Sequence, residues 1–164
     1  MASRTRAESE HAKPPLSVRR VRPSDLAQII ALDERITGLA KPAYWHDVFR
    51  RYGGRRVEGR FFLVAAPPGR APNPPILGFI AGEVRAWEFG SAPCGWVFAL
   101  SVEPDARLHG VGEALLEAIS SEFKRAGVSR MRTMVGRDNR LHLLFFRGEG
   151  MVAGPYIQLE KDLE

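Results

Sequence analysis

The residues whose types and spacing could do chemistry lie between Phe98 and Gly112, in the run F-A-L-S-V-E-P-D-A-R-L-H-G-V-G. The first five residues read as an apolar strand, and Pro104 forbids its continuation in a central ladder. A short loop then leads into the clearest amphipathic pattern of the chain, which predicts a helix over residues 109–126. This order of strand, loop and helix exposes backbone N–H groups at the positive end of a helix.

Two glycines stand at the start of that helix. Gly110 and Gly112 carry no Cβ, so the main chain there can approach an oxyanion closely. Arg107, at the rim of the loop, can add a charge-assisted contact. The segment therefore predicts an anion-binding loop, for which pyrophosphate is the usual ligand. The alternative is that the glycines only allow a tight turn.

Other nucleotide-binding patterns are absent from this segment. Leu115 occupies the third glycine position of a G-x-G-x-x-G dinucleotide fingerprint, and no G-x-x-x-x-G-K-[ST] sequence occurs. The sequence therefore argues against a dinucleotide-dependent enzyme and against an NTPase.

The elements that must position this loop alternate along the chain. Strands are predicted at 17–21, 61–66, 76–87, 96–102 and 129–135, with one or two more over 151–159, and helices at 23–37, 42–52, 109–126 and 138–147. A loop with five prolines, residues 67–75, cannot be regular structure. The class is therefore α/β or mixed α+β.

Composition narrows the class of protein. The 164 residues are 45% hydrophobic and 26% charged, which is typical of one globular domain. We expect a flexible N-terminal tail over residues 1–16 and a domain over 17–164. A single cysteine, Cys94, argues against a disulfide framework or a Cys-rich zinc site. No metal site, membrane span or signal-peptide region is evident, which predicts a soluble cytoplasmic protein.

The charge is lopsided, with twenty Arg, four Lys and a net charge of +5. Arginine presents a planar fork of donors to oxyanions, so phosphate-bearing partners are one interpretation and a solvated surface is the other. A local basic cluster comprises Arg50, Arg51, Arg55, Arg56 and Arg60. This cluster could contact an acidic or phosphate-bearing ligand, and the alternative is a solvated face.

The segment 102–116, V-E-P-D-A-R-L-H-G-V-G-E-A-L-L, resembles the acetyl-CoA signature of the GNAT superfamily of N-acyltransferases. The matching positions are Val102, Pro104, Arg107, Gly110, Gly112, Leu115 and Leu116. A second match to the family lies downstream, at Asn139, Phe145-Phe146 and Gly150-Met151. With the opening V-R-R-V-R-P-S-D-L of residues 18–26, the resemblance covers residues 17–161.

The resemblance implies a mixed, mostly antiparallel sheet of six or seven strands flanked by about four helices. The fourth and fifth strands, about 95–102 and 129–135, would splay apart to admit acyl-CoA. The implied reaction is direct transfer of an acetyl group to a primary amine of a protein, peptide or small molecule, in a ternary complex and without a metal.

The resemblance also implies which residues bind acetyl-CoA. Backbone groups of Leu100, Ser101 and Val102 would meet the pantetheine amides. The pyrophosphate would rest on Arg107, Leu108, His109, Gly110, Val111, Gly112 and Glu113. Asn139 would bond near the pantetheine arm, and Phe146 would pack at the thioester end.

Two departures from the family concern catalysis. Phe146 stands where many members have a tyrosine that protonates the leaving thiolate, so a water, Tyr156 or unaided departure must serve. Trp96 stands roughly where many members carry a glutamate base. Glu83 is the remaining acid on a nearby strand and is assigned as base, the alternative being a solvated charge at a strand edge.

In the family the first two helices wall the acceptor site. Asp33 and Glu34 would hold a cationic amine there, and Tyr44 and Trp45, with Tyr52, would line a channel. The alternative is that the aromatic residues are core and the acids are solvated.

Two other functions stay open. A non-catalytic acyl-CoA-binding regulatory module is consistent with Phe146. The other is an Arg-rich nucleic-acid-binding domain, but the sequence has no zinc pattern, stacking motif or basic recognition helix, which argues against nucleic acid as a partner. A homodimer is possible.

Overall fold

The computed structural model describes residues 15–163, so the tail expected over residues 1–16 lies almost wholly outside the described residues. The strands are β1 Ser17–Arg20, β2 Arg60–Ala66, β3 Gly78–Arg85, β4 Cys94–Val102 and β5 Met131–Thr133. The helices are α1 Leu26–Thr37, α2 Pro42–Val48, α3 Val111–Arg125 and α4 Arg140–Gly148, with short helical turns η1 Pro23–Asp25, η2 Phe49–Gly53, η3 Glu88–Gly90 and η4 Pro104–Ala106. The described chain forms two compact units that divide after Thr133, and each is described by itself.

The first unit is built on one sheet with strand order β1-β2-β3-β4-β5. The first four strands pair antiparallel, and β5 pairs parallel to β4. The expected mixed, mostly antiparallel sheet with four helices is therefore confirmed for the described residues. The sheet has five strands rather than six or seven. Residues 151–159 form no ladder, because Gly154 and Pro155 interrupt the apolar run and proline lacks the N–H that a ladder needs.

Helices α1 and α2 cover one face of the sheet. The buried side chains of Phe62, Val64 and Phe79 meet those of both helices in one hydrophobic cluster. Trp45 of α2 lies at its centre, with ring centroids 5.9 Å from Phe62 and 5.0 Å from Phe79. The apolar spacing over residues 42–52 predicts this inward face, although the helix changes to a π-helical turn at Phe49.

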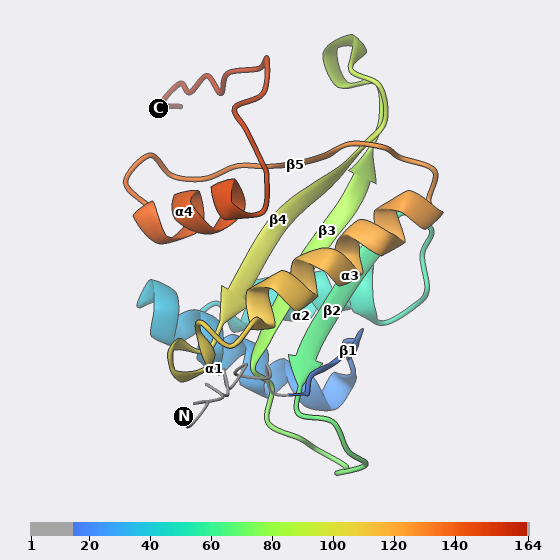
Figure 1. Ribbon diagram of the computed structural model, residues 1–164, viewed down its shortest axis with the longest axis vertical. Helices are drawn as coiled ribbons and strands as arrows, with labels where there is room; N and C mark the ends of the chain where they lie inside the picture. Colours follow the sequence, from blue (N-terminus) through green and yellow to red (C-terminus); the bar gives the residue numbers. More distant parts are fainter. Residues whose placement is uncertain (1–14, 164) are drawn as a thin grey trace, which may run out of the picture. The chain divides into compact units, whose positions relative to one another are not determined.

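Helix α3 covers the opposite face, in front of the sheet in Figure 1. Its Phe123 packs edge-on against Phe61 of β2, with centroids 5.5 Å apart. Two sheet positions beneath it are glycine because nothing larger fits. A Cβ on Gly95 would lie 2.3 Å from the Phe123 ring, and one on Gly82 would lie 3.0 Å from Ile119. The close approach of α3 therefore depends on these two missing side chains.

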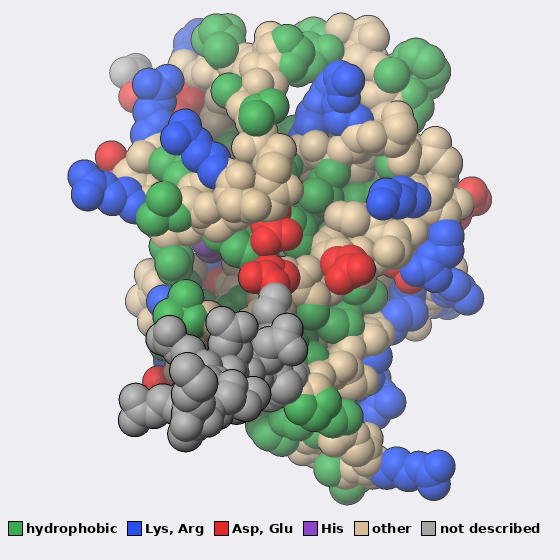
Figure 2. All heavy atoms as spheres, in the orientation of Figure 1, with side chains coloured by type: hydrophobic (Ala, Val, Ile, Leu, Met, Phe, Trp, Pro, Cys, Tyr) green, Lys and Arg blue, Asp and Glu red, His purple; other side chains and the backbone are tan. Residues whose placement is uncertain are grey.

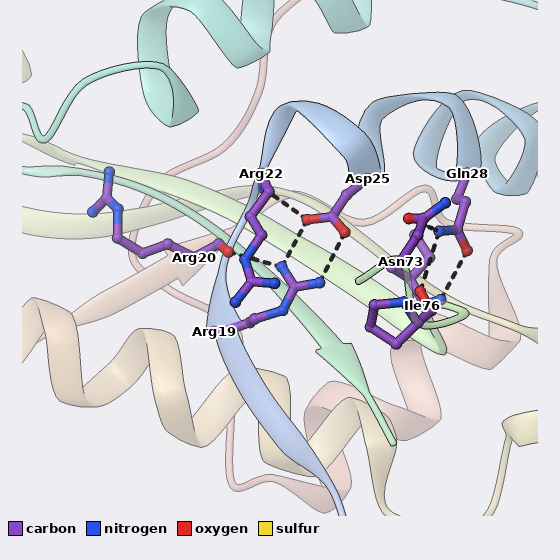
Figure 3. A network of polar contacts seen from close by, with 8 residues as sticks. Arg19, Arg20, Arg22, Asp25, Gln28, Asn73 and Ile76 are labelled. Carbon is purple, nitrogen blue, oxygen red and sulfur yellow. Dashed lines mark hydrogen bonds and ion pairs between the residues drawn. The ribbon is translucent and has the colours of Figure 1, made fainter. Parts of the chain in front are cut away.

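A buried ion pair joins β1 to the start of α1 (Figure 3). The guanidinium of Arg19 donates to both carboxylate oxygens of Asp25 at 2.7 and 2.8 Å, and the backbone N–H of Arg22 donates to the same group at 2.7 Å. Burial alone would raise the pKa of Asp25, but the bonds from Arg19 and Arg22 outweigh it and hold that pKa below its ordinary value. Asp25 is therefore a charged residue of the core.

The proline-rich connection between β2 and β3 is fastened to α1 through one side chain. The Gln28 amide donates to Asn73 Oδ1 and to the Pro74 carbonyl, both at 3.2 Å, and its oxygen accepts from the Ile76 N–H at 3.0 Å (Figure 3). These bonds replace the regular ladder that the prolines exclude.

Candidate functional site

The loop between β4 and α3 is held in an uncommon backbone conformation. After Val102, the Glu103 N–H donates to the Leu77 carbonyl at 2.8 Å, and a short 3-10 turn follows. Leu108 then takes a left-handed backbone with φ of 66°, and Gly110, the N-cap of α3, has φ of 79°. A side chain at such φ values is disfavoured, so glycine suits position 110 and Leu108 is strained.

This conformation leaves backbone donors at the start of α3. The first hydrogen bond of the helix runs from the Ala114 N–H to the Gly110 carbonyl at 3.0 Å. Among the described residues, the N–H groups of Val111 and Gly112 have no backbone acceptor. The N-cap residue, Gly110, has no side chain that could accept a hydrogen bond from these N–H groups. The donor set therefore fits a phosphate group, as the sequence predicts.

The side chains of the loop mostly point away from the chain. Leu108 and His109 are exposed, and Arg107 is half-buried. The loop would thus bind an anion through its main chain, with one guanidinium available at its rim.

Strands β4 and β5 pair over only three residue pairs, from Gly95 with Met131 to Val97 with Thr133. The Thr133 hydroxyl donates to the Val97 carbonyl at 2.9 Å and closes this short ladder. Within residues 15–163, the rest of β4, from Phe98 to Val102, has no strand partner on that side. The expected parting of these two strands is present, and Leu100, Ser101 and Val102 lie along the open edge.

A β-bulge lies where the strands part. Ala81 of β3 faces Ala99 of β4, but Gly82 faces Val97, so Phe98 is an extra residue in β4. A bulge leaves a residue outside the ladder and increases the local twist. Sequence reasoning missed it, because no residue type in this stretch announces a bulge.

Glu83 lies on β3 directly opposite Trp96 of β4, on the face that α1 and α2 cover. Its carboxylate accepts from the Tyr52 hydroxyl at 2.7 Å and from Arg85 Nε at 3.0 Å, and the side chain is 22% exposed. Burial, together with this bond to Glu83, raises the pKa of Tyr52 to about 12. Each oxygen of the Glu83 carboxylate therefore accepts one hydrogen bond. Sequence reasoning missed the bond to Tyr52, which lies near the end of η2.

The residues expected at the acceptor site divide into two kinds. Asp33 is buried, accepts from Trp45 Nε1 at 2.8 Å and pairs with Lys41 Nζ at 2.9 Å. Trp45 is buried with it, so this pair ties α1 to α2. Glu34 and Tyr44 are exposed, and the Tyr44 ring lies 5.0 Å from that of Trp45.

The second unit, residues 134–163, contains α4 and three of the predicted site residues. Asn139 is the N-cap of α4, and its side-chain oxygen accepts from the His142 N–H at 3.0 Å. Phe146 is buried, with its ring centroid 5.1 Å from that of Phe145. Tyr156 is exposed in the segment that follows the helix.

Two surface hollows lie away from Glu83. One of about 400 Å³ runs between β1 and α3, and another of about 440 Å³ adjoins the outer side of the 103–111 loop. The lining of the second includes the acidic residues Glu103 and Asp105 together with His109 and Val111, so this hollow reaches the first turn of α3. Within residues 15–163 no helix is long and apolar enough to cross a membrane, and no group of three His, Cys, Asp or Glu side chains is placed to hold a metal.

Comparison with solved structures identifies several with the same fold. The aminoglycoside N-acetyltransferase AAC(6')-Iy in complex with CoA is 14% identical, with a TM-score of 0.74 over 90% of this chain and 95% of that chain. The aminoglycoside acetyltransferase meta-AAC0020, from an uncultured soil metagenomic sample, in complex with trehalose, is 18% identical, with a TM-score of 0.69 over 91% and 97%. Ard1 from Thermoplasma volcanium is 22% identical, with a TM-score of 0.65 over 84% and 82%.

At the level of sequence, no curated protein matches the chain. Residues 26–149 do match the profile of the acetyltransferase (GNAT) family, a span from the first residue of α1 to just beyond α4. That span includes the loop between β4 and α3, the bulge in β4 and the parting of β4 from β5. The sequence match and the shared fold agree, and the chain belongs to the GNAT acetyltransferase family.

Proposed function

We propose that this protein transfers an acetyl group from acetyl-CoA directly to a primary amine, within a ternary complex. One observation carries the proposal: among residues 15–163, the N–H groups of Val111 and Gly112 at the start of α3 have no backbone acceptor, and they lie beside two residues with left-handed backbone. Family membership supports it, as does the CoA in the structure of AAC(6')-Iy.

The residues proposed to bind acetyl-CoA form two groups in the first unit. Arg107 to Glu113 would bind the pyrophosphate through the main chain and one guanidinium. Leu100, Ser101 and Val102 would offer the amide and carbonyl groups of the open β4 edge to the pantetheine. Bound acetyl-CoA would supply the thioester. The roles expected for Asn139 and Phe146 remain proposals from the family resemblance.

The chain's own chemical task is to accept and deliver protons. A lysine-type amine, with a pKa near ~10.4, costs about 4–5 kcal/mol to present neutral at pH 7, whereas an α-amine near ~8 costs about 1–1.5 kcal/mol. As the amine nitrogen bonds to the acetyl carbon, the C–S bond breaks and the amine proton must leave. We assign the carboxylate of Glu83 to receive it. Tyr156, or solvent, would return a proton to the thiolate.

The acceptor would reach Glu83 from the face that carries α1 and α2. Glu34 and Tyr44 are accessible there and are proposed to contact the acceptor. Asp33 and Trp45 would act through the position of the helices, because both side chains are buried and are bonded to each other across α1 and α2.

The first test is calorimetric titration with acetyl-CoA and with pantetheine, which lacks the pyrophosphate. We expect pantetheine to bind at least 100-fold more weakly. The second is release of CoA thiol from acetyl-CoA in the presence of lysine peptides, N-terminal peptides, polyamines and aminoglycosides, the last because two structural neighbours are named for them. Binding without release for any amine would favour the regulatory module, and absence of binding would refute the proposal.

A further inference from the structure

Positive charge gathers around Tyr52 and Glu83. Six arginines lie on η2, the loop after it, the start of β2 and the end of β3: Arg50, Arg51, Arg55, Arg56, Arg60 and Arg85. The acids of these segments and of the adjoining end of α2 are Asp47, Glu58 and Glu83, so the six arginines exceed them by three formal charges. By contrast, the face that carries α3 shows acidic side chains near its centre and Lys and Arg mainly toward its margins (Figure 2).

Three of these guanidinium groups lie over aromatic rings. The Cζ atoms of Arg51 and Arg60 are 5.6 and 5.4 Å from the centroid of the Tyr52 ring, and that of Arg85 is 4.6 Å from the Trp96 ring. Stacking of this kind holds a guanidinium plane in one orientation, and the N–H groups along the edge of the plane can still donate hydrogen bonds. The arginines are therefore partly ordered before any ligand binds, which reduces the entropy cost of binding.

Among the described residues, two of the three form no ion pair with an acid other than Glu83. Arg51 is paired with Asp47 at 2.7 Å. Arg85 donates through Nε to Glu83 at 3.0 Å, and among the described residues neither its Nη groups nor the guanidinium of Arg60 has a hydrogen-bond acceptor. Arg60 and Arg85 are thus half-buried cations with donors to spare beside the proposed base.

The cluster borders the place where β4 and β5 part. Trp96, beneath Arg85, is the residue before the last pair of that ladder, and the bulged Phe98 packs edge-on against Tyr52 with centroids 5.1 Å apart. Arg60, Glu83 and Trp96 are aligned across β2, β3 and β4. A molecule that brings an amine to Glu83 from this face therefore meets Arg60 and Arg85.

We propose that the acceptor carries an anionic group, a carboxylate or a phosphate, in addition to its amine, and that Arg60 and Arg85 bind this group. The inference rests on the proposed acetyl transfer. The guanidinium groups attract the anion and, as like charges, disfavour the protonated form of the amine, so the same field that binds the acceptor promotes its reactive state. A polycationic amine would be repelled.

The test compares initial rates for acceptors of matched size and different charge. The probes are free glutamate, phosphoethanolamine, peptides with an acidic residue next to a free N-terminus, neutral and basic versions of those peptides, and a polycationic amino sugar. We expect kcat/KM for an anionic acceptor to exceed that of its neutral counterpart at least tenfold, with the gap narrowing as salt is added. The three anionic probes distinguish a free amino acid, a phosphorylated amine and a peptide as the source.

The variants Arg60→Gln and Arg85→Gln should each raise KM for the anionic acceptor about tenfold without changing KM for acetyl-CoA. Arg125→Gln, an exposed arginine on α3, is the matched control and should change neither. The variant readout is the ratio of kcat/KM for anionic over neutral acceptors, which a general loss of stability would leave unaltered. A wild-type preference for neutral or cationic acceptors, or a ratio unchanged by both substitutions, would overturn the proposal.

Binding of an N-acetylated acidic peptide, measured by calorimetry without turnover, separates this inference from the proposed function. Binding that depends on Arg60 and Arg85, with no transfer to any amine, would support the anion site and refute the transferase. Transfer to neutral or basic amines with no binding of the acidic peptide would refute the anion site alone. Neither transfer nor binding would refute both.

Discussion

The two faces of the sheet are built in different ways. Beneath α3, contact depends on the absence of side chains at Gly82 and Gly95, and the loop before α3 presents main-chain N–H groups. Beneath α1 and α2, polar side chains bond between elements, as in Arg19 with Asp25 and Tyr52 with Glu83. The α3 face is specified by backbone shape, and the face under α1 and α2 by side-chain chemistry. We therefore expect stability to fall when atoms are added on the α3 face and when charges are removed on the other.

The largest effect is expected on the polar face, from Asp25→Asn. The substitution leaves the half-buried Arg19 guanidinium without its buried counterion, which should lower the free energy of unfolding by about 3 kcal/mol at pH 7. Because the folded state lowers the pKa of Asp25, its contribution is complete above the ordinary pKa near ~3.9 and is lost as pH falls through the lower folded value. Urea unfolding from pH 7 to pH 3 measures this, and the wild-type advantage should shrink at the acid end.

The exposed Asp162 provides the control for that experiment. Asp162→Asn should change the free energy of unfolding by less than about 0.5 kcal/mol. If Asp25→Asn lowers the free energy of unfolding by less than about 1 kcal/mol, the ion pair is not a main source of stability on this face.

The next effect concerns the proposed base. Glu83→Gln keeps the size of the side chain and its contact with Tyr52 but removes the proton acceptor, and we expect kcat/KM to fall about 100-fold, or about 2.7 kcal/mol in activation free energy. Steady-state kinetics against pH check this, because the loss should be greatest for acceptors with a lysine-type amine. Glu88→Gln, in the same hairpin and exposed, should leave the rate unchanged. Activity within threefold of wild type would remove Glu83 from its role.

On the α3 face, Gly95→Ala adds the methyl group that the Phe123 ring excludes. The overpacking should cost about 2 kcal/mol of stability, measured by thermal or urea unfolding. Combining it with Phe123→Leu should recover part of the loss beyond the sum of the single changes, because the two sites share one space. Additive effects would mean that α3 moves away as a body.

A smaller effect is expected at the N-cap of α3. Gly110→Ala and Gly127→Ala each place a Cβ at a left-handed φ, of 79° and 84° respectively, at opposite ends of the same helix. Each should lose about 1 kcal/mol of stability. Only Gly110→Ala should weaken acetyl-CoA binding, by about tenfold in calorimetry, and equal weakening in both variants would refute a specific role for the loop.

The smallest effect is spectroscopic. The pKa of Tyr52 is raised to about 12 in the folded state. Between pH 10 and 12 the folded state therefore retains a proton that the unfolded state loses, and the free energy of unfolding should decline as pH rises through that range. The difference between tyrosinate titrations of wild type and Tyr52→Phe should show one phenol ionising near the top of this range. A difference curve centred near pH 10 would indicate that the bond to Glu83 does not persist in solution.

These two faces were not equally predictable from sequence. The loop at Gly110 is predictable because its signal is local: a proline that ends a strand, two glycines and the start of an amphipathic helix lie within fifteen residues. The fold class followed from the same local signals together with the family resemblance. The prediction that residues 151–159 form strands failed because apolar spacing was given more weight than Gly154 and Pro155.

The polar face depends on contacts between distant residues, which spacing does not reveal. The sequence points to Glu83 only by elimination, and no pattern in it predicts the hydrogen bond to Tyr52, which is 31 positions earlier. Asp33 was read as a possible ligand for an amine, whereas the structure places it in a buried bond with Trp45. The bulge at Phe98 arises from strand register, which the sequence pattern did not specify.

The short ladder between β4 and β5 has a consequence for motion. A ladder of three residue pairs at the edge of a sheet opens locally more easily than the longer central ladders. We therefore expect the amide protons of β5 to exchange with solvent faster than those of β2 and β3. One wall of the opening could therefore loosen while the four-stranded antiparallel remainder stays closed, which would let a bulky thioester enter without global unfolding.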